Sequence, residues 1–271
     1  MKKALFLAAL IFLGLLVMLT VTANWVLPHS SFEQNVDAIL RSPDARYWMG
    51  TDSLGRDLFA RILLGARVSL VIGVVTSTIT LIIGFTYGAI AGWSEGWVDR
   101  LLMRSNDIFM AIPSFVTVSV LCLTLQMLLP FEDPQARAMV GLCVAISLTQ
   151  WMSIARVTRG MVLEIRRKPF IEAAVALGAS PGHILLKHVL PNIANTLLVL
   201  MALQIPATIL YESFMSFIGL GIQPPYTSWG ILVREGWKTL SDFPHLILFP
   251  SAILFLTVWS FHMVLDQFRN R

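Results

Sequence analysis

Long stretches without Asp, Glu, Lys or Arg divide this chain, and they constrain its fold more than any other feature. A helix needs about 20 predominantly apolar residues to cross a bilayer, and each stretch supplies most or all of them. The six stretches that predict transmembrane helices are residues 4–32, 68–94, 108–131, 138–155, 189–211 and 243–265. The composition agrees, because 56% hydrophobic residues, 13% charged residues and a mean hydropathy of +0.73 exceed what a soluble chain of 271 residues needs. We therefore expect an all-α integral membrane protein with about six transmembrane helices.

A seventh charge-free run, residues 213–233, contains Gly219, Gly221, Pro224 and Pro225. A continuous helix facing lipid there would leave backbone groups without hydrogen-bond partners, which hydrocarbon cannot replace. We predict an outer loop or a re-entrant segment instead.

The region between the second and third stretches carries Asp99, Arg100, Arg104 and Asp107. We expect a cytoplasmic turn there, with local ion pairs that are each worth little if exposed. Pro113 follows early in the third stretch and predicts a kinked helix, because proline removes a backbone donor and clashes with the preceding turn.

The basic residues favour one orientation in the membrane. With six spans, one side of the bilayer receives Lys2, Lys3, Arg100, Arg104, the basic run from Arg156 to Lys187, Arg269 and Arg271. Because Lys and Arg concentrate in cytoplasmic loops, both termini are expected in the cytoplasm. The net charge of +4 then reflects topology and gives no indication of nucleic-acid binding.

The N-terminal region leaves alternatives open. Residues 1–27 resemble a cleavable signal peptide, but their apolar run is longer than usual, so we predict that they stay as the first transmembrane helix. Residues 28–67 then form an extracytoplasmic loop, in which Leu58, Ile62 and Gly65 are spaced for one helical face. An amphipathic helix along the outer surface and a solvated loop both fit this pattern.

Residues 164–195 form a polar, basic island between two apolar runs, and local signals predict a helix, a sharp corner and a second helix. Pro169 suits a first helical turn, Gly178 a left-handed helix end, and Ser180 with Pro181 an N-cap and first helical position. The ordinary alternative is a cytoplasmic loop whose basic residues only fix topology.

The first short helix of this island is predicted to present a smooth surface. Phe170, Ala174 and Leu177 are expected on one face, while the small Ala173 would let a partner's backbone come close. Glu172 would add a charged anchor. The pattern favours a surface that receives another protein.

The sequence contains no recognisable motif for catalysis or metal binding. A phosphate-binding Gly-x-x-x-x-Gly-Lys-Ser/Thr loop is missing, and Lys238 follows a tryptophan instead of a glycine. Cys122 and Cys143 lie inside predicted spans, so they suggest neither a disulfide nor a thiolate site. His183 and His188 are five residues apart, which places them poorly for shared ligation. We therefore predict no catalytic residue, no metal ligand and no bound cofactor.

Four segments of the chain resemble a known family. The strings EAAVALGAS and HVLPN, residues 172–192, resemble the EAA loop of permease subunits of ABC importers, matching its Glu172, Ala173, Ala174, Gly178, Leu190 and Pro191. GTDSLGRD (50–57), GWVDRLLMRSNDIFMAIPSF (96–115) and ESFMSFIGLGIQPPYTSW (212–229) are similar to segments of the dipeptide, oligopeptide and nickel permease branch, of which His188 is also typical. Residues 262–266 depart from the family's Asn-Leu-(Leu/Val)-Gly-Asp-like string, which leaves the contacts of the last helix open.

On this resemblance the chain is identified as a member of that branch, the second or "C-type" permease of a pair, with residues 68–271 as its core transmembrane domain. Within a coupling loop at about 159–191, the resemblance implies contacts with a cytoplasmic ATPase by Phe170, Glu172, Ala173, Ala174, Leu177, Gly178, Ala179, Ser180 and Pro181. A translocation path or outer mouth is implied near Gln204, Glu212, Pro224 and Pro225. Local pairing of Glu212 is the alternative to a place in that path.

The resemblance also implies a cellular setting and partners. These are a bacterial inner membrane, a homologous second permease, two cytoplasmic ATPases that carry ATP and Mg²⁺, and an extracytoplasmic solute-binding protein. A short peptide is the first expectation for the cargo, and nickel or a metal–metallophore complex the second. A secondary transporter driven by an ion gradient would need buried coupling charges, which the spans nearly lack. A membrane scaffold would need no pathway at all.

Overall fold

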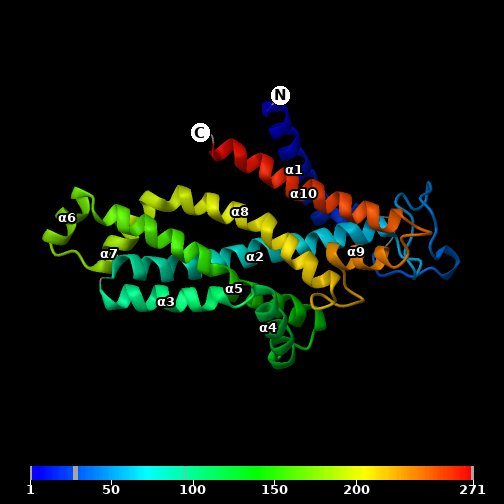
Figure 1. Ribbon diagram of the computed structural model, residues 1–271. Helices are drawn as coiled ribbons and strands as arrows, with labels where there is room; N and C mark the ends of the chain where they lie inside the picture. The colour runs from blue at the N-terminus through cyan, green and yellow to red at the C-terminus, as the bar shows by residue number, and fades with distance from the viewer. Residues whose placement is uncertain (1, 27–29, 95, 270–271) are drawn as a thin grey trace.

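The computed structural model describes residues 2–26, 30–94 and 96–269, and this part of the chain is helical without a β-strand. Its α-helices are α1 (Lys2–Val26), α2 (Leu58–Trp93), α3 (Trp97–Ala111), α4 (Ser114–Leu128), α5 (Pro134–Arg166), α6 (Pro169–Ala176), α7 (Pro181–Ile184), α8 (Leu190–Phe217), α9 (Trp229–Trp237) and α10 (His245–Arg269). A 3₁₀ helix, η1 (Val36–Ala38), and a π-helix, η2 (Leu185–Val189), complete the list. Figure 1 shows an elongated bundle with α6 and α7 at one end and α9 at the other. The all-α prediction is confirmed.

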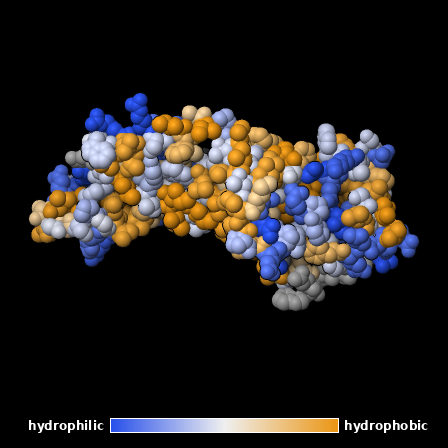
Figure 2. All heavy atoms as spheres, turned by 90° about the horizontal axis from the view of Figure 1, so that it is seen from below, coloured by the Kyte–Doolittle hydropathy of each residue, from blue (hydrophilic) through white to orange (hydrophobic). Residues whose placement is uncertain are grey.

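Among the described residues, five helices are long and apolar enough to cross a membrane, and α3 with α4 makes a sixth span if the two are counted together. Figure 2 shows an apolar band across the middle of the molecule, with hydrophilic residues gathered toward the two ends. In the apolar part of each span, only 17% of the residues of α1 and of α10 are buried, whereas 61% of those of α5 are buried. Helix α5 is therefore central, and the paired α1 and α10 are peripheral. The prediction of about six transmembrane helices is confirmed.

The centre of the bundle is the contact between α2 and α5, which pack along much of their length. Gly84, Gly88 and Gly92 are spaced four apart on one face of α2 and let the two backbones approach. A Cβ added at Gly84 would lie 2.7 Å from the Cβ of Ile154, and one at Gly92 would lie 2.9 Å from the carbonyl oxygen of Arg159. The α2–α5 pair therefore has no room for side chains at these positions.

The third predicted span is a broken helix, in which α3 and α4 meet at 87°. Ile112 is extended (φ −82°, ψ 129°), as expected for a residue before a proline, and the break confirms the kink predicted at Pro113. The turn is shorter than predicted, because α2 ends at Trp93 and α3 begins at Trp97, so the charged residues lie on α3, which packs against α2 and α5. Their ion pairs consequently reach another helix.

Residues 30–57 and α9 form a polar lobe at the end of the bundle opposite α6 (Figure 1). Helix α2 already begins at Leu58, so residues 58–67 are the first turns of a long span. For residues 58–67 both predictions, a helix along the surface and a solvated loop, are wrong, whereas residues 30–57 are a loop with one short 3₁₀ helix. Leu58 and Ile62 do share a face with Gly65, but that face packs inward against α9 and α10.

The seventh apolar run, residues 213–233, was predicted not to form a continuous helix, and the structure agrees. Helix α8 ends at Phe217, Gly219 turns the chain with φ +91°, and α9 begins at Trp229. The indole of Trp229 is fully buried and donates from Nε1 to the carbonyl oxygen of Ile62 over 3.2 Å. This bond fixes the returning segment to the first turns of α2.

Candidate functional site

The corner between α5 and α8 has the local structure that the sequence predicts. Helix α6 begins with a proline and is followed by Gly178 with φ +79°, a conformation that glycine adopts without strain. The N–H of Ala179 donates to the carbonyl oxygen of Ala174 (3.1 Å) and closes the helix end. The Oγ of Ser180 then accepts from the N–H of His183 (3.4 Å) and caps α7. The predicted helix, corner and second helix are confirmed.

One side of α6 is anchored and the other is exposed. Ile171 is 1% exposed and packs in a cluster that includes Val162 of α5. Phe170 and Leu177 are 45% and 88% exposed, although both are large and apolar. Ala174 was predicted on their face but packs partly against the Ile171 cluster. It lies four residues after Phe170 and three after Ile171, so helical geometry places it between the two faces.

A groove of about 620 Å³ runs beside α6 and is bordered by Glu172, Ala179 and Pro181. Its far wall contains Trp93 and Arg166, whose guanidinium lies 5.3 Å from the Trp93 ring centroid and donates to the Trp93 carbonyl oxygen over 2.8 Å. The exposed carboxylate of Glu172, the small alanines of α6 and the exposed Phe170 and Leu177 side chains form one surface at this end of the molecule.

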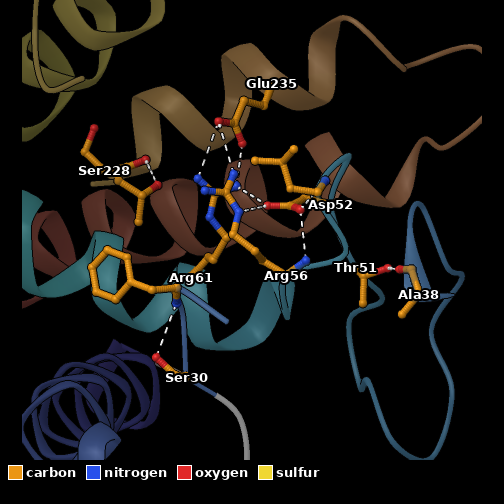
Figure 3. A network of polar contacts seen from close by, with 11 residues as sticks. Ser30, Ala38, Thr51, Asp52, Arg56, Arg61, Ser228 and Glu235 are labelled. Atoms are coloured by element: carbon orange, nitrogen blue, oxygen red, sulfur yellow. Dashed lines mark hydrogen bonds and ion pairs between the residues drawn. The ribbon is translucent and has the colours of Figure 1, made fainter. Parts of the chain in front are cut away.

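A buried cluster of charges holds the polar lobe together (Figure 3). The Oδ2 of Asp52 accepts from Nε of Arg56 (2.7 Å) and from Nη1 of Arg61 (2.6 Å). Nη1 of Arg61 also donates to Oε2 of Glu235 on α9 (2.5 Å). The two cations and two anions compensate each other, which lets Asp52, Arg56 and Arg61 stay buried at the end of an apolar bundle.

The GTDSLGRD segment supplies Asp52 and Arg56 of this cluster and the N-cap of α2. The carboxylate of Asp57 accepts from the N–H of Phe59 (2.9 Å) and caps the helix. Gly55 has φ +71° and lies directly under the backbone of Asn35, so a side chain would collide there. The segment is therefore a structural joint between the lobe and the bundle.

The returning segment after α8 is also tied to α5. The hydroxyl of Tyr226 donates to Oδ1 of Asp133, the N-cap of α5, over 3.3 Å. The N–H groups of Ala136 and Gln135 hold the pKa of Asp133 below its usual value, and the negative charge of Asp133 raises the pKa of Tyr226.

The structure does not gather the residues that were predicted for a path or outer mouth. Gln204 lies halfway along α8 and donates from Nε2 to Oε1 of Gln150 on α5. Pro224 and Pro225 are exposed and joined by a cis peptide bond at the lobe, where Pro224 borders a cavity of about 300 Å³. Glu212 is 0% exposed.

The Glu212 carboxylate accepts hydrogen bonds from the hydroxyls of Ser69 and Ser216, both over 2.8 Å. Ser69 also accepts a hydrogen bond from the backbone N–H of Trp229 over 3.4 Å. In this conformation Glu212 pairs locally and joins α8 to α2, while Ser69 links the pair to the start of α9.

Sequence reasoning missed two ion pairs between α3 and α5. Arg159 donates from Nε and Nη2 to both carboxylate oxygens of Asp99 over 2.6 Å, a bidentate geometry. Nη2 of Arg156 donates to Oδ1 of Asp107 over 2.6 Å, with both side chains more than half exposed. The acids are eight residues apart and the arginines only three, so their spacing in the sequence does not indicate that they pair. In the described part of the chain, no group of three or more His, Cys, Asp and Glu could hold a metal ion.

The fold is shared with a chain of an ABC transporter. The structure matches a chain of the inward-facing MetNI methionine ABC transporter with a TM-score of 0.61 at 19% identity, covering 79% of this chain and 97% of that one. A second crystal form of the same transporter gives a TM-score of 0.58. At this low identity the likeness concerns the fold alone.

The sequence comparisons are more specific. The family described as "Binding-protein-dependent transport system inner membrane component" matches residues 84–271. The chain is 33% identical to the oligopeptide transport system permease protein OppC of Bacillus subtilis, covering 97% of this chain and 84% of that protein. It is 35% identical to the dipeptide permease DppC of the same organism (99% and 81% covered) and 33% identical to the glutathione permease GsiD of Pectobacterium atrosepticum (97% and 84%). The chain therefore belongs to this family of multi-pass inner-membrane proteins, as an ABC importer permease of the branch that contains the peptide permeases.

Proposed function

We propose that this permease passes short peptides across the cytoplasmic membrane. The observation that supports the proposal is that relatives matching nearly the whole chain are named for oligopeptide, dipeptide and glutathione transport. These three cargoes share the peptide bond. A permease that recognises that bond would accept all of them.

We further propose that the importer is driven by two cytoplasmic ATPases and that the surface around α6 binds one of them and transmits its conformational change. The large exposed side chains of this surface, Phe170 and Leu177, suit insertion into a groove on such a partner. Ile171 ties α6 to a cluster that contains Ala89 of α2 and Val162 of α5. A displacement of α6 would therefore be passed to the central helix pair, provided that the two ATPase states contact α6 differently.

Binding of an ATPase at α6 also fixes the orientation of the chain in the membrane and the sides on which the other partners bind. With α6 in the cytoplasm, both termini are cytoplasmic and the polar lobe faces outward, where a solute-binding protein would deliver the cargo. A homologous second permease would complete the pathway. ATP and Mg²⁺ would be held by the ATPases, and this chain would contribute no catalytic residue and no cofactor.

The test of the cargo is transport by the intact complex. We would purify the complex in mild detergent, identify the subunits that accompany the chain, and reconstitute it in liposomes with its binding protein. ATP-dependent uptake of radiolabelled trialanine, with little uptake of radioactive nickel, is expected. Uptake of nickel alone would overturn the peptide assignment, and a complex without an ATPase would overturn the proposed energy source.

Two substitutions test the role of α6. Glu172→Lys reverses the exposed charge, and Gly178→Asp adds a side chain where the backbone is left-handed. Each is expected to lower uptake and the stimulation of ATP hydrolysis while the amount of inserted permease stays unchanged. Glu132→Lys is the matched control, because Glu132 is also exposed but lies between α4 and α5, outside the groove and outside the coupling loop. Normal transport by both α6 variants would exclude this surface as the input site.

A further inference from the structure

A groove of about 530 Å³, lined by both polar and apolar side chains, lies where α3 and α4 meet, and its opposite walls come from α5 and α8. None of the residues that line it is charged. Its polar groups are the side chains of Ser114, Thr149, Gln150, Ser153, Gln204 and Tyr211. The volume falls within the range of small-ligand sites in proteins.

Two amide side chains face each other across this groove, at mid-length of two long spans. Gln150 is the middle residue of α5, and Gln204 lies halfway along α8. Their mutual hydrogen bond uses one N–H and one carbonyl oxygen, whereas two amides together offer four N–H donors and two carbonyl acceptors. Polar groups at this depth are costly unless they serve a function or have partners.

The break between α3 and α4 adds backbone groups to the same groove. The backbone N–H of Ser114 makes no hydrogen bond to any other residue that the structure describes. The carbonyl oxygens of Met110 and Ala111 likewise receive no backbone donor within the described ranges. Irregular backbone at membrane depth is tolerated only inside protein or beside a water-filled cavity. The groove is therefore suited to a transport path and unsuited to contact with lipid.

We propose that this groove is a subsite for the main chain of the transported peptide, with Gln150 and Gln204 as the residues that contact it. The proposal rests on the peptide cargo proposed above. Amide side chains present both donors and acceptors, as the N–H and C=O groups of a peptide require. An uncharged wall tolerates varied cargo side chains, and it directs recognition to the interior peptide bond and away from the charged termini.

The test compares uptake of trialanine with uptake of the same peptide methylated on its central nitrogen. Each peptide is bound to the binding protein beforehand, and a saturating amount of this loaded protein is added to the reconstituted complex. Methylation removes one N–H, so the wild-type maximal rate is expected to fall about tenfold, as for one lost hydrogen bond. In Gln150→Leu and Gln204→Leu the unmethylated peptide is expected to be slowed by a similar factor. The further effect of methylation is then expected to disappear in at least one of them.

Gln135→Leu is the matched control, because Gln135 lies in the first turn of α5 outside this groove. It is expected to keep the full effect of methylation. Persistence of that effect in both groove variants would overturn the subsite while leaving peptide transport intact. Absence of trialanine uptake by the wild type would instead refute the peptide cargo, and the subsite with it.

Labelling keeps the proposal testable if the leucine variants fail to assemble. Ser114→Cys places a thiol in the groove, whereas the native Cys122 and Cys143 are buried and give the background. A membrane-impermeant methanethiosulfonate reagent is expected to label this variant in the assembled complex, and trialanine-loaded binding protein is expected to slow the labelling. A thiol that does not react would show that lipid or the second permease seals the groove, which contradicts the proposal.

Discussion

Arg61 and Asp52 form a buried ion pair, with Nη1 and Oδ2 2.6 Å apart and side chains that are 1% and 5% exposed. Asp52 belongs to the loop of the polar lobe and Arg61 to the second turn of α2, so the pair joins two elements that local sequence rules treat separately. Glu235 extends the pair to α9. These ion pairs tie the loop of the lobe to α2 and α9.

Replacing Arg61 with methionine is expected to destabilise the lobe. Arg56 alone would then have to balance the buried Asp52 and the partly exposed Glu235, leaving a net negative charge in the cluster. Removal of one partner from a buried ion pair typically costs about 3–5 kcal/mol. We expect a clear fall in the unfolding temperature of the purified complex and a higher rate of proteolysis between residues 30 and 57.

Arg41→Met is the control for this prediction. Its partner Asp44 lies 2.7 Å away, but the two side chains are 52% and 29% exposed. An exposed pair contributes about 0–1 kcal/mol, so a small change is expected. Equal destabilisation by the two substitutions would show that burial of the cluster is not the source of its stability.

The close contact between α2 and α5 predicts that a single added methyl group lowers the stability of the permease. A Cβ at Gly88 would collide with the carbonyl oxygen of Ala155, which is backbone and cannot rotate away. Gly88→Ala is expected to cost about 1–3 kcal/mol, as overpacking does elsewhere, and to lower the unfolding temperature. Gly160→Ala on α5 is the comparison, because nothing lies within 4 Å of its added Cβ. That substitution is expected to be neutral or stabilising, since alanine is the better helix former.

Several elements could be predicted because the rules that govern them act on neighbouring residues. The spans follow from apolar length, the break at Pro113 from the restricted backbone before a proline, and the α6 corner from Gly178 and the cap at Ser180. Each of these features is decided within a few turns of chain. No knowledge of the packing was needed.

The start of α2 was missed for the opposite reason. The charges of Arg61 and Arg67 ended the charge-free run, and the first turns of the helix were therefore assigned to a loop. Arg61 is tolerated there because Asp52 and Glu235 neutralise it, and Glu235 lies 174 residues away in the sequence. The groove at Gln150 and Gln204 also depends on two distant helices, so one amide alone gave no signal.

Glu212 allows a test of whether its hydroxyl partners stabilise α8 against α2. Glu212→Gln keeps the length and one carbonyl acceptor, and the serine hydroxyls can accept from the new amide. Glu212→Leu leaves Ser69 and Ser216 without this acceptor in a buried site, at a cost of about 1–3 kcal/mol per unsatisfied group. We expect near-normal thermal stability for the glutamine variant and a marked loss for the leucine variant. Equal losses in the two would show that the negative charge itself is required.

The bidentate pair of Asp99 and Arg159 predicts the outcome of a charge exchange between α3 and α5. Asp99→Arg places two guanidinium groups together and Arg159→Asp two carboxylates, so each single variant is expected to lower uptake by the reconstituted complex. The double variant restores opposite charges at the same two positions and is expected to recover part of the lost activity.

The exposed pair of Asp107 and Arg156 provides the reference, because its partners are 62% and 53% exposed and the same exchange there should change little. If the double variant at Asp99 and Arg159 transports no better than the worse single variant, one of these side chains acts outside the pair. If it recovers fully, the pair serves only to hold α3 against α5. Partial recovery with normal thermal stability would indicate that movement of the broken span depends on which helix, α3 or α5, carries the positive charge.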